Sequence, residues 1–208
     1  MIRLALLRHA ATAWNEERRL QGGTDLALSP GGRAAAAAWR LPGWLLRPGV
    51  RWLASPLARA GETAALLHAS HPGAPAPAIE PRLSEMSFGR WEGCRLAELR
   101  AADPEGVAAL EARGLDFAAP GGESPRQVQA RLAPLLAELA AAGRDTLAVT
   151  HKGVIRALYA RATGWPMLGR PPDRLDLGRL QVLRLAADGT PALEQLNLAI
   201  EPPPGPPP

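Results

Sequence analysis

Short apolar runs alternate along this chain with segments whose apolar residues recur at the spacing of a helix. The runs at residues 2–7, 50–55 and 146–150 are typical of buried β-strands. Helical spacing follows them at residues 33–46, 56–68 and 154–163. This repeated alternation of strand and helix predicts an α/β layer architecture with a largely parallel central sheet.

Capping residues define the start of two of the predicted helices. Ser29 before Pro30 offers an N-cap and a proline at the first helical position, so we expect this helix to continue to Leu46. Ser124 before Pro125 repeats the pattern, and the helix that it starts is expected to stop at Gly143.

Residues 83–122 differ from the rest of the chain, because Gly, Trp and charged residues are mixed there without a clear period. Such a segment is typical of an excursion that covers a substrate. We therefore place a lid around residues 83–123.

The end of the chain contains two late strands and a tail. Residues 180–185 and 192–197 alternate in hydrophobicity on either side of the turn Asp188-Gly189. A single domain is expected over residues 1–200, and a disordered, Pro-rich tail over residues 201–208.

Composition restricts the class of protein. The 208 residues are 47% hydrophobic, which is enough for a full core. Cys94 is the only cysteine, so internal disulfides and multi-cysteine zinc sites are excluded, and a reducing compartment fits. The apolar start, Met1 to Leu7, is too short for a signal sequence, and no stretch is long enough to span a bilayer. We expect a soluble, cytoplasmic protein.

Charge narrows the choice of partner. The 24 basic and 20 acidic residues are interleaved, which gives a net charge of +4 without a basic run. Such a mild excess suits a small anionic substrate, whereas nucleic-acid and membrane partners are not expected. A homodimer is compatible with the sequence, which leaves the oligomeric state open.

Cationic and imidazole groups follow all three predicted core strands. Arg8-His9 follows the first strand, Arg59 the second and His151-Lys152 the third. Because ligands bind at the carboxyl ends of adjacent strands in open α/β sheets, these groups could converge on one point. Arginine forks match phosphate oxygens, and a neutral imidazole is a nucleophile toward phosphorus. The sequence therefore predicts phosphoryl-transfer chemistry.

The same residues carry a family resemblance. Leu7-Arg8-His9-Ala10-Ala11-Thr12 resembles the Arg-His-Gly-x-Thr signature of histidine phosphatases and cofactor-dependent phosphoglycerate mutases. Further segments resemble the family in order: Asn15, Gln21-Gly22 with Asp25, 28–32, 55–60 with Thr63-Ala64, Glu85, 89–93, 120–124 and 150–156. The resemblance implies a three-layer α/β/α sandwich with a mostly parallel, mixed central sheet, which is the phosphoglycerate mutase-like fold.

Residue roles follow from this resemblance position by position. It implies that His9 is the nucleophile and forms a phosphohistidine, and that Glu85 is the general acid, whose pKa should need raising. Arg8, Arg59 and His151 would surround the transferred phosphoryl group, and Asn15 would add a donor. Thr12, Gln21 and Gly22 complete the predicted phosphate-binding set. No metal and no cofactor are required in this scheme.

Two positions depart from the family pattern. Ala10 replaces a glycine, so the backbone there must avoid conformations that only glycine accepts. Lys152 replaces a small residue after His151, where it could add a cation at the pocket mouth and favour a substrate with more than one negative group, or point to solvent.

Several other residues have plainer interpretations. Asn15 could instead cap the turn after Thr12, and Glu92 is the next candidate for the acid. His68 and His71 are interpreted as surface residues. Solvated charges are the simplest interpretation of Arg18, Arg19, Arg90 and Arg95.

Other functions remain as alternatives. A phosphoglycerate mutase would return the phosphoryl group to a second hydroxyl, but mutases carry an Arg directly after the acid, and Met86 stands there. A non-catalytic member would be expected to lose His9 or Glu85. A metallohydrolase lacks its usual ligand motifs. Among phosphatases, 89–93 and the compact lid most resemble the α-ribazole phosphatase, broad-specificity and fructose-bisphosphatase-like subgroup, and the substrate stays undetermined.

Overall fold

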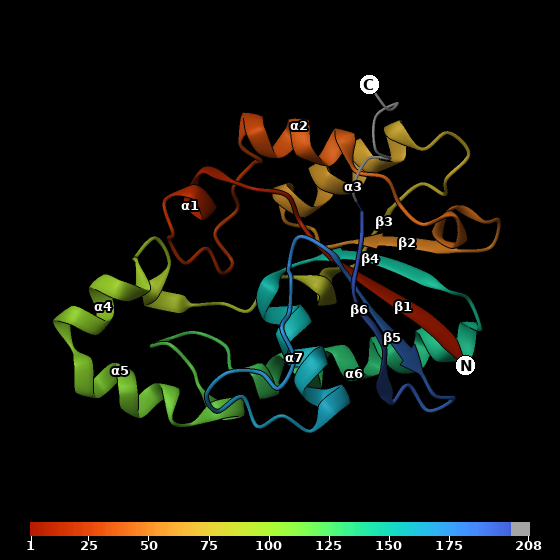
Figure 1. Cartoon of the computed structure of the whole chain (residues 1–208). Helices are drawn as coiled ribbons and strands as arrows, with labels where there is room; N and C mark the ends of the chain where they lie inside the picture. The colour runs from red at the N-terminus through yellow and green to blue at the C-terminus, as the bar shows by residue number, and fades with distance from the viewer. Residues whose placement is uncertain (201–208) are drawn as a thin grey trace.

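The computed structural model describes residues 1–200, and the predicted tail at 201–208 lies outside the described residues. Its centre is a six-stranded sheet of order β3-β2-β4-β1-β5-β6 (Figure 1). The strands are β1 (Ile2–Arg8), β2 (Arg51–Ala54), β3 (Ala78–Ile79), β4 (Thr146–Thr150), β5 (Leu180–Leu185) and β6 (Pro191–Leu198). Strands β3, β2, β4 and β1 are parallel, whereas β5 is antiparallel to both of its neighbours. The sheet is therefore mixed and mostly parallel, as predicted.

Helices cover both faces of this sheet (Figure 1). Helix α2 (Pro30–Ala38) packs on α3 (Ala58–Ser70) on one face, and α6 (Pro125–Ala142) packs on α7 (Lys152–Thr163) on the other. The predicted three-layer α/β/α architecture is confirmed.

The alternation of side chains along β1 explains how one strand serves both layers. Leu4 and Leu6 belong to the apolar cluster formed with α6 and α7. Ala5 and Leu7 point the other way and join the cluster that includes α3. Because neighbouring residues of a strand face opposite sides, a continuous apolar run is buried on both faces.

One predicted helix is too long. The helix expected to reach Leu46 begins at Pro30 with Ser29 as its N-cap, but it ends at Ala38, and a separate 3₁₀ turn forms at Gly43–Leu46. Trp39 is already extended, with ψ 140°. Pro42 explains the break, because proline disfavours helical backbone at the residue before it and removes a helical donor. The helix starting at Ser124 runs as predicted to the left-handed Gly143.

The prediction that His71 lies on the surface is wrong. Its ring is buried, its Nε2 accepts from Leu41 N at 3.1 Å, and its Nδ1 lies 2.8 Å from Leu67 O. His68 is half-buried and its ring packs edge-on against Trp52. Both histidines therefore help to join α3 to the β2 layer, far along α3 from its N-terminal end.

Residues 83–123 form a series of short elements. Three of them are 3₁₀ turns: Pro81–Leu83, Gly89–Trp91 and Gly114–Asp116. The other two are the helices α4 (Leu96–Ala102) and α5 (Pro104–Glu111). In Figure 1 the two helices project beyond the carboxyl ends of the central strands. Trp91, Val107 and Ala119 give this segment a small apolar cluster of its own. The middle of the segment is thus packed on itself, whereas Leu83 and Met86 join the core cluster that includes Leu6 and Leu53 of the sheet.

Candidate active site

A cavity of about 820 Å³ opens at the carboxyl ends of β1, β4 and β2. Its lining includes seven of the predicted site residues: Arg8, His9, Asn15, Gln21, Gly22, Arg59 and Glu85. His151 is fully buried beside them, with its ring centroid 5.1 Å from that of His9. Strand β4 lies between β1 and β2, so the residues that follow these strands meet, as their positions in the sequence indicated.

The orientation of His9 fixes its tautomer. Its Nδ1 lies 2.7 Å from the carbonyl oxygen of Ala10. A carbonyl oxygen only accepts hydrogen bonds, so Nδ1 must carry the proton and donate it. The lone pair therefore remains on Nε2, which makes no hydrogen bond to the described residues.

The electrostatic setting keeps His9 neutral. Burial, followed by the positive charge of Arg8, lowers the pKa of His9 to about 3, and Arg59 acts in the same direction. A hydrogen bond to Ala10 opposes these effects only in part. An uncharged imidazole with a free Nε2 is the form required of a nucleophile.

Two arginines line the cavity and have unused, buried Nε donors. The Nε of Arg8 and the Nε of Arg59 are both buried without a hydrogen-bond partner among the described residues. The terminal nitrogens of Arg59 donate to Thr24 O at 2.8 Å and to Gly22 O at 2.7 Å. Buried polar groups are normally paired, so unpaired guanidinium donors at a cavity indicate an anion site.

His151 contributes a further unpaired atom. Its Nε2 lies 2.7 Å from Ser55 Oγ, while its Nδ1 is buried without a partner in the described part of the chain. Burial holds the pKa of His151 well below its ordinary value, and the electrostatic effects of His9, Arg59 and Arg8 act in the same direction. If Ser55 donates its hydroxyl proton to Nε2, the neutral ring carries its own proton on Nδ1 and offers a donor there.

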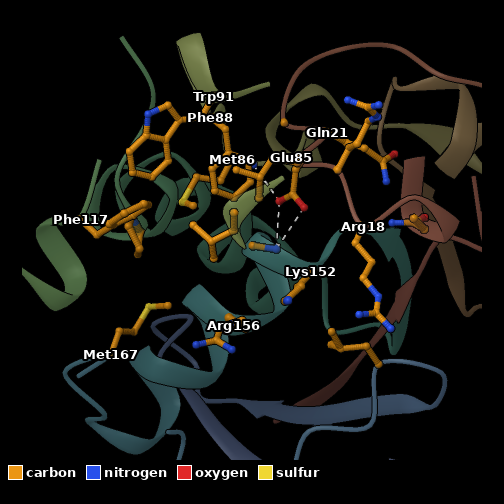
Figure 2. A pocket seen from close by; sticks show the side chains of 18 of the residues that line it. Arg18, Gln21, Glu85, Met86, Phe88, Trp91, Phe117, Lys152, Arg156 and Met167 are labelled. Carbon is orange, nitrogen blue, oxygen red and sulfur yellow. Dashed lines mark hydrogen bonds between the residues drawn. The ribbon is translucent and has the colours of Figure 1, made fainter. Parts of the chain in front are cut away.

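Glu85 lies at the N-terminal end of α7. Its Oε1 accepts from Met86 N at 2.8 Å and from Gly153 N at 3.0 Å (Figure 2). Burial nevertheless raises the pKa of this carboxyl, because desolvation outweighs these hydrogen bonds and the nearby arginines. The direction is the one expected of a general acid. Gly153 is needed here, since a Cβ at that position would lie 2.5 Å from Glu85 Oε1.

Glu92, the alternative acid, is occupied differently. Its carboxylate accepts from Gly23 N at 2.9 Å, from Thr24 N and Oγ1 at 2.9 and 2.6 Å, and from Phe88 N at 3.1 Å. Burial alone would raise the pKa of Glu92, but the hydrogen bonds, led by that from Thr24, have the larger combined effect, so the pKa is lowered overall. Glu92 therefore joins the loop at 22–24 to residues 87–88 as a fixed anion. Gly22, at φ +54°, leaves room for that carboxylate.

Asn15 and Thr12 form the cap that the sequence offered as a plainer interpretation. Thr12 is the N-cap of α1 (Ala13–Glu16), and Asn15 Oδ1 accepts from Thr12 N at 3.1 Å. Thr12 is fully buried and does not line the cavity, whereas Asn15 does. The cap uses only Oδ1 and the backbone of Asn15, so the Nδ2 donors stay available on the cavity side.

Ala10 fits where the family pattern has glycine. It is not among the described non-glycine residues with positive φ, and its side chain joins an apolar cluster with Leu28 and Ala36. Its N–H donates to Thr63 Oγ1 at 3.1 Å. The methyl group of Ala10 is therefore accommodated without backbone strain. The hydrogen bond to Thr63 connects the loop to α3.

The cavity extends beyond these residues in two directions (Figure 2). Lys152 and Arg156 of α7 line one side, and Arg18, interpreted above as a solvated charge, lines it as well. The rest of the wall is apolar: Met86, Phe88, Trp91 and Phe117 lie on the other side, and Met167 lies next to Arg156. Sequence patterns did not reveal this apolar wall, because its members come from irregular segments without a period.

Comparison with known proteins identifies the family. The chain matches the model of the histidine phosphatase superfamily (branch 1) over residues 4–199. The chain belongs to the histidine phosphatase superfamily. Within it, the chain is 36% identical to a glucosyl-3-phosphoglycerate phosphatase of Mycolicibacterium vanbaalenii, over 91% of this chain and 88% of the relative. It is also 36% identical to a metal-independent phosphoserine phosphatase of Arabidopsis thaliana, over 77% of this chain and 68% of the relative.

Solved structures agree with this assignment. The structure of a mycobacterial glucosyl-3-phosphoglycerate phosphatase in complex with VO₃ superposes with a TM-score of 0.76 and 30% identity, covering 96% of this chain and all of that one. The fold is therefore phosphoglycerate mutase-like, as the resemblance implied. As a histidine phosphatase with relatives named as phosphatases, the chain is a phosphoric monoester hydrolase.

Two further observations concern residues 1–200. No helix there combines the length and apolar character needed to cross a bilayer. Within the same residues, His, Cys, Asp and Glu side chains form no group of three or more that could hold a metal ion.

Proposed function

We propose that this histidine phosphatase hydrolyses a small phosphorylated metabolite through a phosphohistidine on His9, with Glu85 as general acid. One observation carries the proposal. Of five buried side-chain atoms without a partner in the described chain, four surround one cavity beside His9: Arg8 Nε, Gln21 Oε1, Arg59 Nε and His151 Nδ1. A phosphoryl group would supply partners for the donors in this set.

In the first step, Nε2 of His9 attacks phosphorus and a P–N bond forms as the ester P–O bond breaks. The departing oxygen takes a proton from the Glu85 carboxyl group. In the second step, water attacks phosphorus and gives a proton to the Glu85 carboxylate. The P–N bond breaks, inorganic phosphate leaves, and neutral His9 is restored.

The cationic groups lower the energy of the transition state. Charge accumulates on the three equatorial oxygens, where Arg8 and Arg59 donate from fixed positions. When the Ser55 hydroxyl donates its proton to His151 Nε2, the ring proton of His151 is on Nδ1 and can be donated to the phosphoryl group. Ser55 is therefore a positioning residue. Asn15 adds donors through Nδ2, and Gln21 and Gly22 shape the adjoining loop.

Relatives support the phosphate ester but not one particular alcohol. Proteins similar to this chain are named for glucosyl-3-phosphoglycerate and for phosphoserine, which share the phosphate group and differ in the rest of the molecule. The segment 83–123 supplies Glu85 and most of the apolar wall, and we assign it the role of a lid over the departing alcohol.

Trapping of the covalent intermediate tests the mechanism. Enzyme mixed with a radiolabelled phosphate ester and quenched within milliseconds should carry label that is stable in alkali and released by acid, as a phosphohistidine is. His9→Ala should retain its circular dichroism spectrum and lose turnover on the order of 10⁶-fold, the size of loss seen when a covalent nucleophile is removed.

The matched control is His68→Ala, which removes a half-buried histidine outside the cavity and should keep the label. Label that persists in His9→Ala would overturn the proposal. Assay of 3-phosphoglycerate separates the alternative activity, because a mutase would form 2-phosphoglycerate and a phosphatase releases inorganic phosphate.

A further inference from the structure

The first two turns of α7 carry two cations into the cavity. Lys152 and Arg156 are four residues apart, so they lie on the same face of the helix. Both line the cavity that contains Arg8 and His9 (Figure 2). Lys152 is also the only lysine of the chain.

This arrangement works against the stability of the helix. Lys152 is the first residue of α7, where the positive end of the helix dipole disfavours a cation. Like charges four residues apart repel each other as well. Lys152 is an exposed residue, and desolvation of its ammonium group at the cavity, followed by the charges of Arg156 and Arg8, still lowers its pKa.

Acidic side chains compensate these charges only in part: Glu85 favours the charged form of Lys152, but desolvation, Arg156 and Arg8 outweigh it and the pKa of Lys152 stays lowered. Within residues 1–200, neither Lys152 nor Arg156 makes an ion pair or a side-chain hydrogen bond; Arg156 packs instead over the Trp165 ring at 5.0 Å. Two carboxylates line the cavity. Glu85 is bound to backbone N–H groups of α7 and its neighbour, and Glu111 is paired with Arg100 at 2.5 Å.

The wall opposite these cations is apolar, so it cannot neutralise their charge. Met86, Phe88, Trp91 and Phe117 offer no charge and no strong hydrogen-bond acceptor. A neutral substrate would leave Lys152 and Arg156 uncompensated when the cavity fills and water is excluded. An anionic group on the substrate would satisfy both.

We propose that Lys152 and Arg156 form a second anion subsite, which binds a carboxylate or a second phosphate on the substrate beyond the phosphoryl group that is transferred. The inference rests on the proposed function, because it assumes that the phosphoryl group occupies the set around His9. It assigns the substrate to the phosphate esters whose alcohol carries a second acidic group.

Three families of ω-substituted alkyl phosphates, with chains of three to five carbons, test this subsite. One family ends in a carboxylate, one in a second phosphate and one in a neutral hydroxyl. For the wild-type protein, kcat/KM at the best chain length should be at least about tenfold higher for an anionic end than for hydroxyl, the effect of a charge-assisted contact. Preference for one anion identifies it.

The variants Lys152→Gln, Arg156→Gln and their double should lower that ratio toward one. The ratio, rather than the rate, is the readout, since Lys152 also lies near Arg8 and influences both esters. Arg161→Gln, an exposed cation on the same helix outside the cavity, removes equal charge and should leave the ratio unchanged.

A ratio near one for both anions at all chain lengths, or a ratio that survives the double substitution, would overturn the subsite while leaving the phosphatase intact. If no ester is hydrolysed, the proposed function has failed separately. The subsite is then decided by calorimetry of the same esters, where anionic ends should bind about tenfold more tightly, and the double variant should lose that difference.

Discussion

The two halves of the cavity are built in different ways. Arg8 is the last residue of β1, and His9 and His151 directly follow β1 and β4. The backbone N–H of His9 donates to Thr150 O at 2.9 Å, so the sheet itself fixes their positions. Segment 83–123 reaches the same cavity from short turns and two small helices, and brings Glu85 and an apolar wall.

The difference separates two tasks. In the proposed mechanism the strand-end residues surround the phosphoryl group, which is the same in every ester, and a rigid sheet suits a constant geometry. In the same proposal the segment contacts the departing alcohol, which varies between esters, and loops accept such variation more readily. Glu92 links the halves, because its carboxylate holds both the 22–24 loop and Phe88 N. Substitutions in the two halves should therefore differ in how their effects depend on the ester.

Glu85→Gln should have the largest ester-dependent effect. Loss of a general acid costs about 10²–10⁴-fold when the leaving alkoxide is basic, as from an alkyl phosphate. p-Nitrophenyl phosphate leaves without protonation and should be slowed much less. Single-turnover rates on both esters measure the ratio of defects. Equal defects would assign Glu85 a structural or water-positioning role instead.

Arg59→Ala and His151→Ala should each lower kcat by roughly 10²–10³-fold, about 2.7–4 kcal/mol of lost transition-state stabilisation. Unlike the loss in Glu85→Gln, this defect should be alike for alkyl and p-nitrophenyl phosphate, because both carry the same phosphoryl oxygens. Steady-state kinetics with both esters give the comparison. A change confined to KM would contradict the assigned role. Arg144→Gln, an exposed substitution outside the cavity, is the control.

Ser55→Ala sharpens the comparison further. It removes the hydroxyl beside His151 Nε2, and the ring is then free to move its proton away from Nδ1. We expect a loss of about tenfold in kcat, smaller than for His151→Ala and equal across esters, since a net hydrogen bond is worth about 1 kcal/mol. Ser55→Thr, which keeps a hydroxyl group, should recover part of the rate. Activity of Ser55→Ala equal to wild type would remove Ser55 from the mechanism.

The smallest predicted effect concerns stability and pH. The pKa of Glu85 is higher in the folded protein than in the unfolded chain. The contribution of Glu85 to the free energy of unfolding is therefore complete below the unfolded pKa near 4.5, and it is lost as pH rises through the folded pKa. Glu85→Gln has no such loss and keeps acceptors for Met86 N and Gly153 N. Its Tm should exceed that of the wild type at pH 8 by roughly 2–4 °C, the shift that about 1 kcal/mol produces at this size. A difference that does not shrink toward pH 4.5 would argue against burial of the carboxyl as its cause.

Sequence patterns predicted the sheet-based half well because its physics is local. A buried strand needs a short apolar run, and a residue directly after it, such as His9 or His151, must stand at the sheet edge. Ser124 and Gly143 likewise mark the ends of α6 by their own capping chemistry. The predicted helix was too long because the helical spacing of apolar residues continues to Leu46, whereas Pro42 prevents the helix from continuing through that segment.

The other half depends on contacts between residues far apart in the chain. Burial of His71 follows from Leu41, thirty residues away, and the apolar wall joins Phe88 and Phe117 to Met167. Arg18 has the sequence context of a solvated charge, and only the tertiary arrangement brings it to the cavity. The proposal of Glu85 rather than Glu92 as the acid also needed the fold, because hydrogen bonds from the 22–24 loop lower the pKa of Glu92, whereas burial raises that of Glu85.

The unpaired buried nitrogens around His9 have a consequence for the end of the catalytic cycle. Arg8 Nε, Arg59 Nε and His151 Nδ1 find partners in any tetrahedral oxyanion, and inorganic phosphate is one. The product therefore competes with the ester for the site, and bound phosphate raises the melting temperature in proportion to the logarithm of its concentration above Kd. In the proposed mechanism, product inhibition thus follows from the same complementarity that stabilises the transition state, and the concentration of inorganic phosphate determines what fraction of the enzyme is free to bind the ester.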